Sequence, residues 1–299
     1  MGKLLICDPV DASAVKAMRA AGVQVDVRDD ISLEDLAAVI GEYEAIVVRS
    51  RTKVKADLID HGTNLKLIVR GGVGVDTIDV AHAESKGIVV RNTPAASSNA
   101  VAELALGMMF ALVREIPRAD SSMKAGKWEK KRFEGIELSG KTLGIIGYGR
   151  IGRTLAAKAR ALGMNVVAYD PYLKHEDLVA LDVLLGAADF VSLHIPHTQE
   201  THNLLGEPEL AMMKHGAYLV NAARGGTVDE QALYGALVSG HLAGAALDVF
   251  TEEPPKSEAL LQLIGLPQVI ATPHIGAATG EAQERIGGEI VTIVTEAMA

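Results

Sequence analysis

The chain has 299 residues and a formal net charge of −9 at pH 7, and 48% of its residues are hydrophobic although only 4% are aromatic. This length suffices for two domains that each bury a core, and the aliphatic composition favours parallel sheets whose strands are buried on both faces. The negative charge disfavours a nucleic-acid partner, and no stretch reaches the roughly 18 consecutive apolar residues of a membrane-spanning helix. We therefore expect neither a nucleic acid nor a membrane as partner.

The first third of the chain alternates short apolar segments with helical ones. We predict helices at residues 12–21, 33–40, 56–61 and 80–86, and strands at residues 3–7, 24–28, 45–50, 65–70 and 88–91. Such alternation is typical of a parallel sheet with helices on both faces. Pro94 ends the last strand, and a long helix is predicted over residues 97–114.

Cys7, in the first apolar segment, is the only cysteine of the chain. A single cysteine excludes an intrachain disulfide and a thiolate metal cluster, so we predict a buried small residue. The N-terminus lacks a basic segment followed by a long apolar one, and no signal peptide is indicated. We expect a soluble cytoplasmic protein.

A basic stretch with one tryptophan, residues 124–132, follows the long helix. A solvated arm or a subunit contact is the favoured interpretation, ahead of nucleic-acid binding. Because Trp128 and Phe133 on such an arm need an apolar partner, we expect a homodimer or a dimer-based oligomer.

A second unit, residues 142–278, opens with a glycine-rich turn between a predicted strand and an alanine-rich helix. Gly147, Gly149 and Gly152 have the GxGxxG spacing. The first glycine permits a tight turn, the second lets the backbone approach a pyrophosphate, and the third lets the helix pack on the strand. Asp170 follows the next strand, where an acid that binds the cofactor ribose is expected. The pattern predicts a dinucleotide site.

The rest of this unit continues the alternation of strands and helices. Its six predicted strands, the number that a full dinucleotide-binding sheet requires, are residues 143–146, 165–169, 190–195, 218–221, 243–249 and 269–272.

The last segment, residues 280–299, is a predicted helix with one apolar face formed by Ile286, Ile290, Ile293 and Val294. This face must be buried, and the first domain is the expected partner. We therefore predict a discontinuous first domain of residues 1–96 and 280–299 and a dinucleotide-binding domain of residues 97–279; the resemblance described below implies that the first is the substrate-binding domain and the second the NAD-binding domain.

Three chemically useful side chains follow strands of the second unit, at the edge where open parallel sheets bind ligands. Arg224 is a fixed cation, His274 is a candidate acid or base, and Glu253 is a carboxylate that could hold the histidine. A nicotinamide enzyme that acts on a hydroxy acid needs one group of each kind. Each residue alone could be a surface residue, but their joint placement favours catalysis.

The nine histidines raise the question of a metal site. His194 and His197 are three residues apart, but Pro196 lies between them at the end of a predicted strand. We predict that the chain binds no metal.

Five blocks of the sequence resemble the D-isomer-specific 2-hydroxyacid dehydrogenase family, and most closely its D-3-phosphoglycerate dehydrogenases. The blocks are residues 72–76, 144–152, 221–229, 244–254 and 272–278. The resemblance implies an α/β protein of two doubly wound parallel-sheet domains: a central Rossmann NAD domain and a flavodoxin-like substrate domain formed from both chain ends. It also implies that Arg224 orients the substrate, His274 exchanges the proton and Glu253 supports the histidine.

The resemblance further implies a set of cofactor contacts at Gly147, Gly149, Arg150, Ile151, Gly152, Asp170, Ile195, Pro196, Ala222, Ala223, Arg224, Asp248, His274, Gly276 and Ala277. Asp170 favours NAD over NADP, because a carboxylate repels a 2′-phosphate.

The resemblance also implies that the backbone amides of Val73 and Gly74 bind the substrate carboxylate. The remaining substrate contacts fall on Arg49, Ser50, Arg70, Arg224 and His274. Arg49 and Arg70 end strands of the first domain, and arginine binds phosphate through paired hydrogen bonds, so we expect a phosphorylated substrate. The neighbouring Arg51 and Lys53 could instead merely decorate a loop.

The leading hypothesis is NAD-dependent oxidation of 3-phospho-D-glycerate to 3-phosphooxypyruvate, the first step of phosphorylated L-serine biosynthesis. One alternative is a glyoxylate, hydroxypyruvate or other D-2-hydroxyacid reductase. Another is a non-catalytic NAD(H)-sensing binding protein, against which the set of Arg224, Glu253 and His274 argues. The chain ends with its closing helix, so we expect the short form without a regulatory amino-acid-binding domain.

Overall fold

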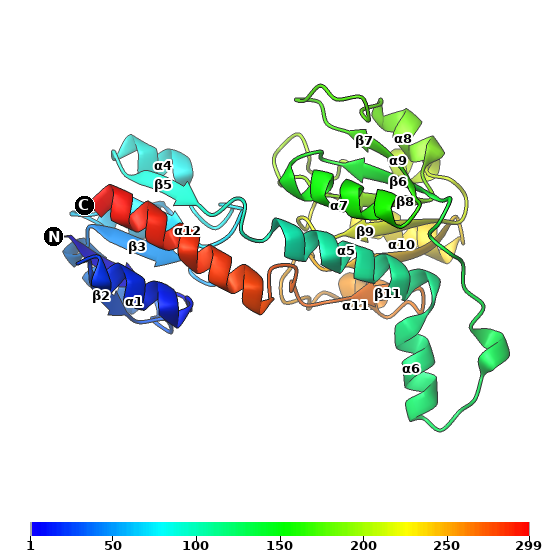
Figure 1. Ribbon diagram of the computed structural model, residues 1–299, viewed down its shortest axis with the longest axis horizontal. Helices are drawn as coiled ribbons and strands as arrows, with labels where there is room; N and C mark the ends of the chain where they lie inside the picture. Colours follow the sequence, from blue (N-terminus) through cyan, green and yellow to red (C-terminus); the bar gives the residue numbers. More distant parts are fainter. Residues whose placement is uncertain (1, 299) are drawn as a thin grey trace. The chain divides into compact units, whose positions relative to one another are not determined.

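The computed structural model describes residues 2–298, which divide into two compact units (Figure 1). Unit 1 comprises the chain up to Ser98 and from Ala277 onward, and unit 2 comprises Asn99–Gly276. The chain therefore passes from one unit to the other twice, at 98/99 and at 276/277, where the sequence predicted 96/97 and 279/280.

Unit 1 is built on a five-stranded parallel sheet with the order β2-β1-β3-β4-β5. This is the flavodoxin-like order, so the predicted fold class of this unit is confirmed. Its strands are β1 (Lys3–Ile6), β2 (Gln24–Val27), β3 (Ala45–Val48), β4 (Leu67–Arg70) and β5 (Val89–Asn92). The central strands are apolar on both faces because helices cover both, as all four residues of β3 are buried.

The helices of unit 1 include the last helix of the chain. They are α1 (Ala12–Ala20), α2 (Leu33–Val39), a short 3₁₀ turn (Ile40–Glu42), α3 (Ala56–His61), α4 (Val80–Ser85) and α12 (Gly280–Met298). Helix α12 packs on α1 and β4, and it buries Ile286, Ile290 and Val294 in the same cluster as Leu4 and Ile6. Ile293, predicted on the same face, is only partly buried.

Unit 2 contains a six-stranded parallel sheet with the order β11-β10-β9-β8-β6-β7. Its strands are β6 (Thr142–Ile146), β7 (Asn165–Tyr169), β8 (Phe190–Leu193), β9 (Ala217–Asn221), β10 (Leu242–Leu247) and β11 (Val269–Ala271). The strand order reverses between β7 and β8 on either side of β6, which is the switch point where this fold binds dinucleotides.

These are the six strands that the sequence predicted, but they differ in one respect from the standard Rossmann set. The position of the third Rossmann strand, beside β7, holds only a single parallel bridge between Ala168 and Leu178. An additional strand, β11, lies at the opposite edge of the sheet, so the sheet still has six strands. The segment around Leu178 is partly buried and too short to read as a strand in the sequence.

The helices of unit 2 cover both faces of its sheet. They are α5 (Ser98–Val113), α6 (Ile116–Lys124), α7 (Arg150–Ala161), α8 (Leu181–Ala187), α9 (Glu207–Met212), α10 (Glu230–Val238) and α11 (Glu258–Ile264), with a 3₁₀ turn at Lys130–Arg132. Successive residues of a strand pack in the cores on opposite faces of the sheet: Ile145 belongs to one apolar cluster and Ile146 to the other. None of the helices within residues 2–298 has the length and apolar character needed to cross a membrane.

A protruding arm, residues 115–137, joins α5 to β6 and contains α6, which the sequence analysis did not predict (Figure 1). The arm exposes Ile116, Met123 and Ile136, and Trp128 is 79% exposed. These apolar side chains of the arm are therefore largely exposed to solvent rather than packed against unit 2.

Two adjacent glycines of α12 give a matched test of the packing between α12 and α1. A Cβ at Gly287 would lie 3.0 Å from the Ala14 Cβ, whereas a Cβ at Gly288 would meet no atom within 4 Å. We expect Gly288→Ala to raise the free energy of unfolding by about 0.5–1 kcal/mol, because alanine lowers the entropy of the unfolded chain. Gly287→Ala should give no such gain, and urea unfolding of both variants measures the difference. Equal gains would show that the helices are not in close contact at Gly287.

Candidate active site

The glycine-rich turn leads from β6 into α7. Gly147 has a φ of +94°, and a Cβ there would lie 2.6 Å from the His194 carbonyl oxygen. A Cβ at Gly152 would overlap the Gly147 carbonyl oxygen, so this glycine lets α7 pack on the turn. At Gly149, in contrast, a Cβ would meet no protein atom within 4 Å. The packing of the chain does not require glycine at position 149, which fits a position where a ligand approaches the backbone.

The first turn of α7 begins with Arg150 and Ile151, and no side chain caps its N-terminal amides. Asp170 follows β7 and is half-buried; its Oδ2 accepts a hydrogen bond from the Tyr148 amide at 3.0 Å, and its Oδ1 accepts one from the Tyr172 amide at 3.0 Å. A glycine turn, an uncapped helix N-terminus and an acid after the second strand together fit NAD. The turn and helix amides would hold its pyrophosphate and Asp170 its ribose.

The other predicted cofactor residues of unit 2 follow the strands beyond the switch point. Ile195 and Pro196 follow β8, and the largely buried Ala222 and Ala223 follow β9. These four residues lie at the carboxyl edge of the sheet. Their contacts with NAD stay a prediction.

Asp248, which follows β10, has a structural role that the sequence did not reveal. Its side chain is only 1% exposed. Oδ1 accepts hydrogen bonds from Thr272 Oγ1 at 2.6 Å and from the Ile275 amide at 2.8 Å, and Oδ2 accepts one from the Gly276 amide at 2.8 Å. The carboxylate thereby holds the turn that carries His274, which adopts the left-handed conformation at φ +52°. The predicted contact of Asp248 with the cofactor is untested.

His274 and Glu253 form a direct pair in unit 2, with His274 Nδ1 2.7 Å from Glu253 Oε2. The other carboxylate oxygen, Oε1, accepts a hydrogen bond from the Phe250 amide at 3.1 Å. Burial opposes ionisation of Glu253, but the hydrogen bond and charge of His274, the Phe250 amide and the charge of Arg224 outweigh it. They hold the pKa of Glu253 below its ordinary value. Nε2 of His274 is then the ring nitrogen left for proton exchange with a substrate.

Arg224 lies on the loop that follows β9, and its backbone is held by two side chains. Asn221 Nδ2 and Thr227 Oγ1 both donate to the Arg224 carbonyl oxygen, at 3.1 and 2.7 Å. The loop packs against the Phe250 backbone so closely that a Cβ at Gly225 would overlap the Phe250 carbonyl. The structure thus brings the loops of Arg224, Glu253 and His274 together within unit 2. The chemical roles of these residues are untested.

In unit 1, the candidate substrate residues lie on the loops after β3 and β4. Val73 and Gly74 follow β4, and within the described chain neither backbone amide donates to a protein acceptor. Two adjacent amides of this kind suit a carboxylate. Two arginines lie close to the neighbouring glycines of this loop. A Cβ at Gly72 would overlap the Arg70 guanidinium, and a Cβ at Gly71 would lie 3.5 Å from Arg49 Cγ.

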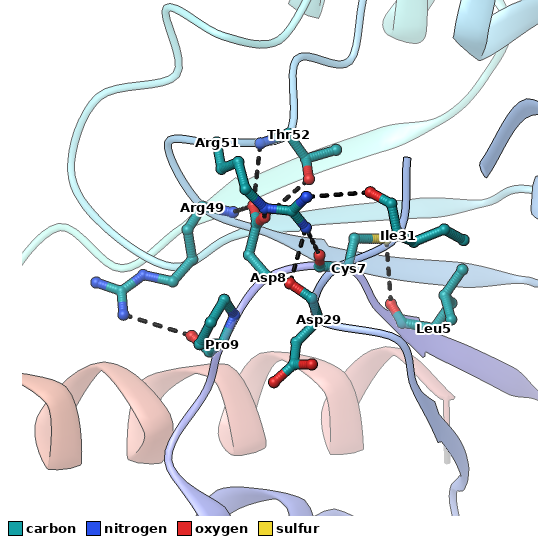
Figure 2. Close-up of polar contacts among 9 residues, drawn as sticks. All are labelled: Leu5, Cys7, Asp8, Pro9, Asp29, Ile31, Arg49, Arg51 and Thr52. Carbon is teal, nitrogen blue, oxygen red and sulfur yellow. Dashed lines mark hydrogen bonds and ion pairs between the residues drawn. The ribbon is translucent and has the colours of Figure 1, made fainter. Parts of the chain in front are cut away.

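The loop after β3 is organised by Asp8, a buried residue that the sequence analysis did not single out (Figure 2). Its carboxylate accepts hydrogen bonds from the backbone amides of Arg49 and Thr52, from Thr52 Oγ1 at 2.8 Å and from Arg51 Nε at 2.9 Å. The Arg51 guanidinium also donates to the carbonyls of Cys7, Asp29 and Ile31. Arg51 is therefore a structural cation, and the idea that it merely decorates the loop is wrong.

The Arg49 side chain points away from this cluster (Figure 2) and is half-buried, while Ser50 is exposed. Arg49 Nη1 donates to Gln283 Oε1 on α12, and Gln283 Nε2 donates to the Ala277 carbonyl at 2.7 Å. Burial lowers the pKa of Arg49, although the charge of Asp8 acts in the opposite direction. The sequence analysis did not single out Gln283, because its partner Arg49 is 234 residues away in the chain.

Two other sequence expectations concern Cys7 and the histidines. Cys7 is buried as predicted, and burial together with the charge of Asp8 raises the pKa of its thiol to about 12. His194 Nε2 lies 2.9 Å from Ser192 Oγ, and burial lowers the pKa of His194 to about 4. His197 instead lies on the exposed loop beside His202. Within residues 2–298, no group of three or more histidine, cysteine or acidic side chains is placed to hold a metal ion.

Comparisons with known proteins identify the family. The model of the D-isomer specific 2-hydroxyacid dehydrogenase, NAD binding domain, matches residues 106–276. The chain is also 49% identical to the hydroxypyruvate reductase of Thermotoga maritima, over 95% of this chain and 94% of that protein. The chain belongs to the D-isomer specific 2-hydroxyacid dehydrogenase family.

Two further relatives extend this result. The D-3-phosphoglycerate dehydrogenase of Methanocaldococcus jannaschii is 48% identical over 99% of this chain, which spans 56% of the length of that protein. The crystal structure of a D-lactate dehydrogenase from Aquifex aeolicus, complexed with NAD and lactic acid, matches with a TM-score of 0.85 and 33% identity, covering 98% of this chain and 94% of that one. This member of the family is an NAD-dependent D-2-hydroxyacid dehydrogenase, and NAD fits the glycine turn and Asp170 described above.

Gly149 and Gly152 allow the cofactor site to be tested separately from the fold. We expect Gly149→Ala to leave the melting temperature within about 2 °C of wild type, because its Cβ meets no protein atom. The same Cβ should weaken NADH binding by about tenfold or more, because it occupies the approach to the backbone. Fluorescence titration with NADH and a thermal melt measure the two effects.

Gly152→Ala is the matched control and should lower the melting temperature, since its Cβ overlaps the Gly147 carbonyl. Unchanged NADH affinity in Gly149→Ala would show that the cofactor does not approach this turn.

Proposed function

We propose that the protein oxidises 3-phospho-D-glycerate to 3-phosphooxypyruvate with NAD, the first step of phosphorylated L-serine biosynthesis. The observation that carries this proposal is the placement of Arg49 and Arg70 in unit 1, beside the loop that presents the amides of Val73 and Gly74. Two guanidinium groups suit a phosphate, and two adjacent amides suit a carboxylate. Phosphoglycerate carries one group of each kind.

The proton chemistry is assigned to unit 2. Arg224 binds the substrate carboxylate and polarises the oxygen at C2. His274 removes the proton of the C2 hydroxyl through Nε2, because Nδ1 is held by Glu253 at 2.7 Å. Glu253 fixes the orientation of the ring and stabilises the imidazolium that forms, since its own pKa is held low and it stays ionised. NAD, when bound, supplies the hydride acceptor.

A second candidate is the reduction of hydroxypyruvate or another small 2-oxo acid with the same groups. The Thermotoga maritima relative favours it, because that hydroxypyruvate reductase matches along 94% of its own length, whereas the phosphoglycerate dehydrogenase of Methanocaldococcus jannaschii is matched along 56%. A non-catalytic NAD(H) sensor is disfavoured, because it would not need the paired Glu253 and His274.

Replacement of Arg49 distinguishes the two candidate substrates. We expect Arg49→Met to lower kcat/KM for 3-phosphoglycerate by about 10- to 100-fold, which corresponds to the loss of charge-assisted hydrogen bonds worth about 1.5–3 kcal/mol. The kcat/KM for unphosphorylated D-glycerate should change by less than about threefold. Steady-state NAD reduction with both acids measures the two constants.

The matched control is Arg91→Met, which removes an exposed arginine of β5 in the same unit and should leave both constants unchanged. An equal loss for both acids in Arg49→Met would contradict a phosphate-binding role. A wild-type enzyme that prefers hydroxypyruvate to its phosphorylated form would support the second candidate.

We also propose that the protein forms a homodimer through the arm. The apolar side chains of Ile116, Met123, Trp128 and Ile136 are exposed there, and the base of the arm borders a cavity of about 230 Å³ whose lining includes Leu112. A second copy of the chain would remove this apolar surface from water.

Sedimentation velocity at micromolar concentration should therefore show a dimer. We expect Trp128→Ala to raise the dimer dissociation constant by about tenfold or more, as for other central aromatic side chains of interfaces. Tyr172→Ala removes an equally exposed aromatic side chain outside the arm and should leave the dimer intact. A monomeric wild-type protein would rule out the dimer.

A further inference from the structure

Tyr148 stands between the first two glycines of the turn, at a position where the glycine motif requires no particular side chain. The residue is nevertheless only 3% exposed. Its hydroxyl donates a hydrogen bond to Asp177 Oδ2, and its ring contacts the His175 ring edge-to-face with 5.0 Å between the centroids. A buried hydroxyl with a carboxylate partner indicates a specific contact rather than a filler of the core.

Asp177 belongs to the segment that replaces the third Rossmann strand. Among residues 2–298, this segment pairs with the sheet through a single bridge at Leu178, for which the Ala168 amide donates to the Asp177 carbonyl and the Val179 amide donates to the Ala168 carbonyl, both at 2.8 Å. Arg160, near the end of α7, also binds the Asp177 carboxylate. Two backbone hydrogen bonds hold an edge weakly, so the side chains of Tyr148 and Arg160 supply contacts that a full strand would supply through its backbone.

The charge of Asp177 suits this role. Burial opposes its ionisation, but the hydrogen bonds from Tyr148 and Arg160 and the charge of Arg160 outweigh the effect and lower the pKa of Asp177. The carboxylate therefore accepts hydrogen bonds from both side chains at neutral pH.

The backbone of Tyr148 contacts the cofactor site directly. Its amide donates to Asp170 Oδ2 at 3.0 Å, and its carbonyl accepts a hydrogen bond from Arg153 Nε at 3.0 Å. Tyr148 thus connects two carboxylates: its hydroxyl binds that of Asp177, and its amide binds that of Asp170.

We propose that Tyr148 is a positioning residue for the cofactor: its hydroxyl, held by Asp177 and Arg160, fixes the peptide that orients Asp170. Asp170 in turn accepts hydrogen bonds from an unmodified ribose and repels a 2′-phosphate. A loosened Tyr148 peptide would both weaken NADH binding and reduce the preference for NADH over NADPH. A residue that served only to fill the core would change stability without changing that preference.

The test is fluorescence titration of Tyr148→Phe with NADH and with NADPH, together with a thermal melt. We expect the NADH dissociation constant to rise about fivefold and the ratio of the NADPH to the NADH constant to fall about threefold. Tyr43→Phe is the matched control, because it removes another buried tyrosine hydroxyl bound to a carboxylate, that of Asp26 at 2.9 Å in unit 1. It should lower the melting temperature but leave both dissociation constants unchanged.

Arg160→Met provides a second test if Tyr148→Phe does not fold, since Arg160 is 44% exposed and its loss leaves the core intact. It should raise the NADH dissociation constant by about twofold and lower the ratio of the NADPH to the NADH constant, as in Tyr148→Phe but by less. Unchanged constants and an unchanged ratio in the folded variants would overturn the proposal. Because the titrations contain no hydroxy acid, their outcome does not depend on which substrate the enzyme uses.

Discussion

Loops at the carboxyl ends of parallel strands carry backbone amides that no neighbouring strand can pair, and one buried carboxylate in each unit accepts them. Asp8 follows β1 and accepts the amides of Arg49 and Thr52, and Asp248 follows β10 and accepts those of Ile275 and Gly276. Both side chains are 1% exposed. Charge-assisted hydrogen bonds in such surroundings are strong, and a buried acceptor left without its donors is costly. The conformation of each functional loop therefore depends on one aspartate that itself need not touch a ligand.

The sequence predicted the fold because the signals are local and repeated. Short apolar segments that alternate with helices indicate parallel sheets, and the glycine spacing before an alanine-rich helix indicates the dinucleotide turn. The same reasoning found Arg224, Glu253 and His274, since each follows a strand of unit 2. The structure brings the loops of these three residues together, and the Glu253–His274 pair is in direct contact.

What the sequence did not predict depends on contacts between distant residues. Arg51 looks like Arg49 in the sequence, yet its guanidinium donates to three carbonyls on the two segments that follow β1 and β2, while that of Arg49 points away from them. The structural role of Asp248 was not predicted, because its hydrogen bonds to the turn of His274 join residues more than 20 positions apart. The single bridge at the third Rossmann position left no pattern in the sequence, and α6 was missed because its nine residues include only two large apolar side chains, Ile116 and Met123.

The division of the chain has a consequence for how substrate range can diverge within this family. Arg224, Glu253, His274 and the carboxylate that holds the histidine turn all lie within Asn99–Gly276. The arginines that we propose to bind a phosphorylated acid lie in the other unit, and the loop of Arg49 is organised by a separate aspartate. Under this proposal, substitutions on those loops would alter which acid is recognised without disturbing the Glu253–His274 pair. The same chemistry could thus be combined with different recognition surfaces.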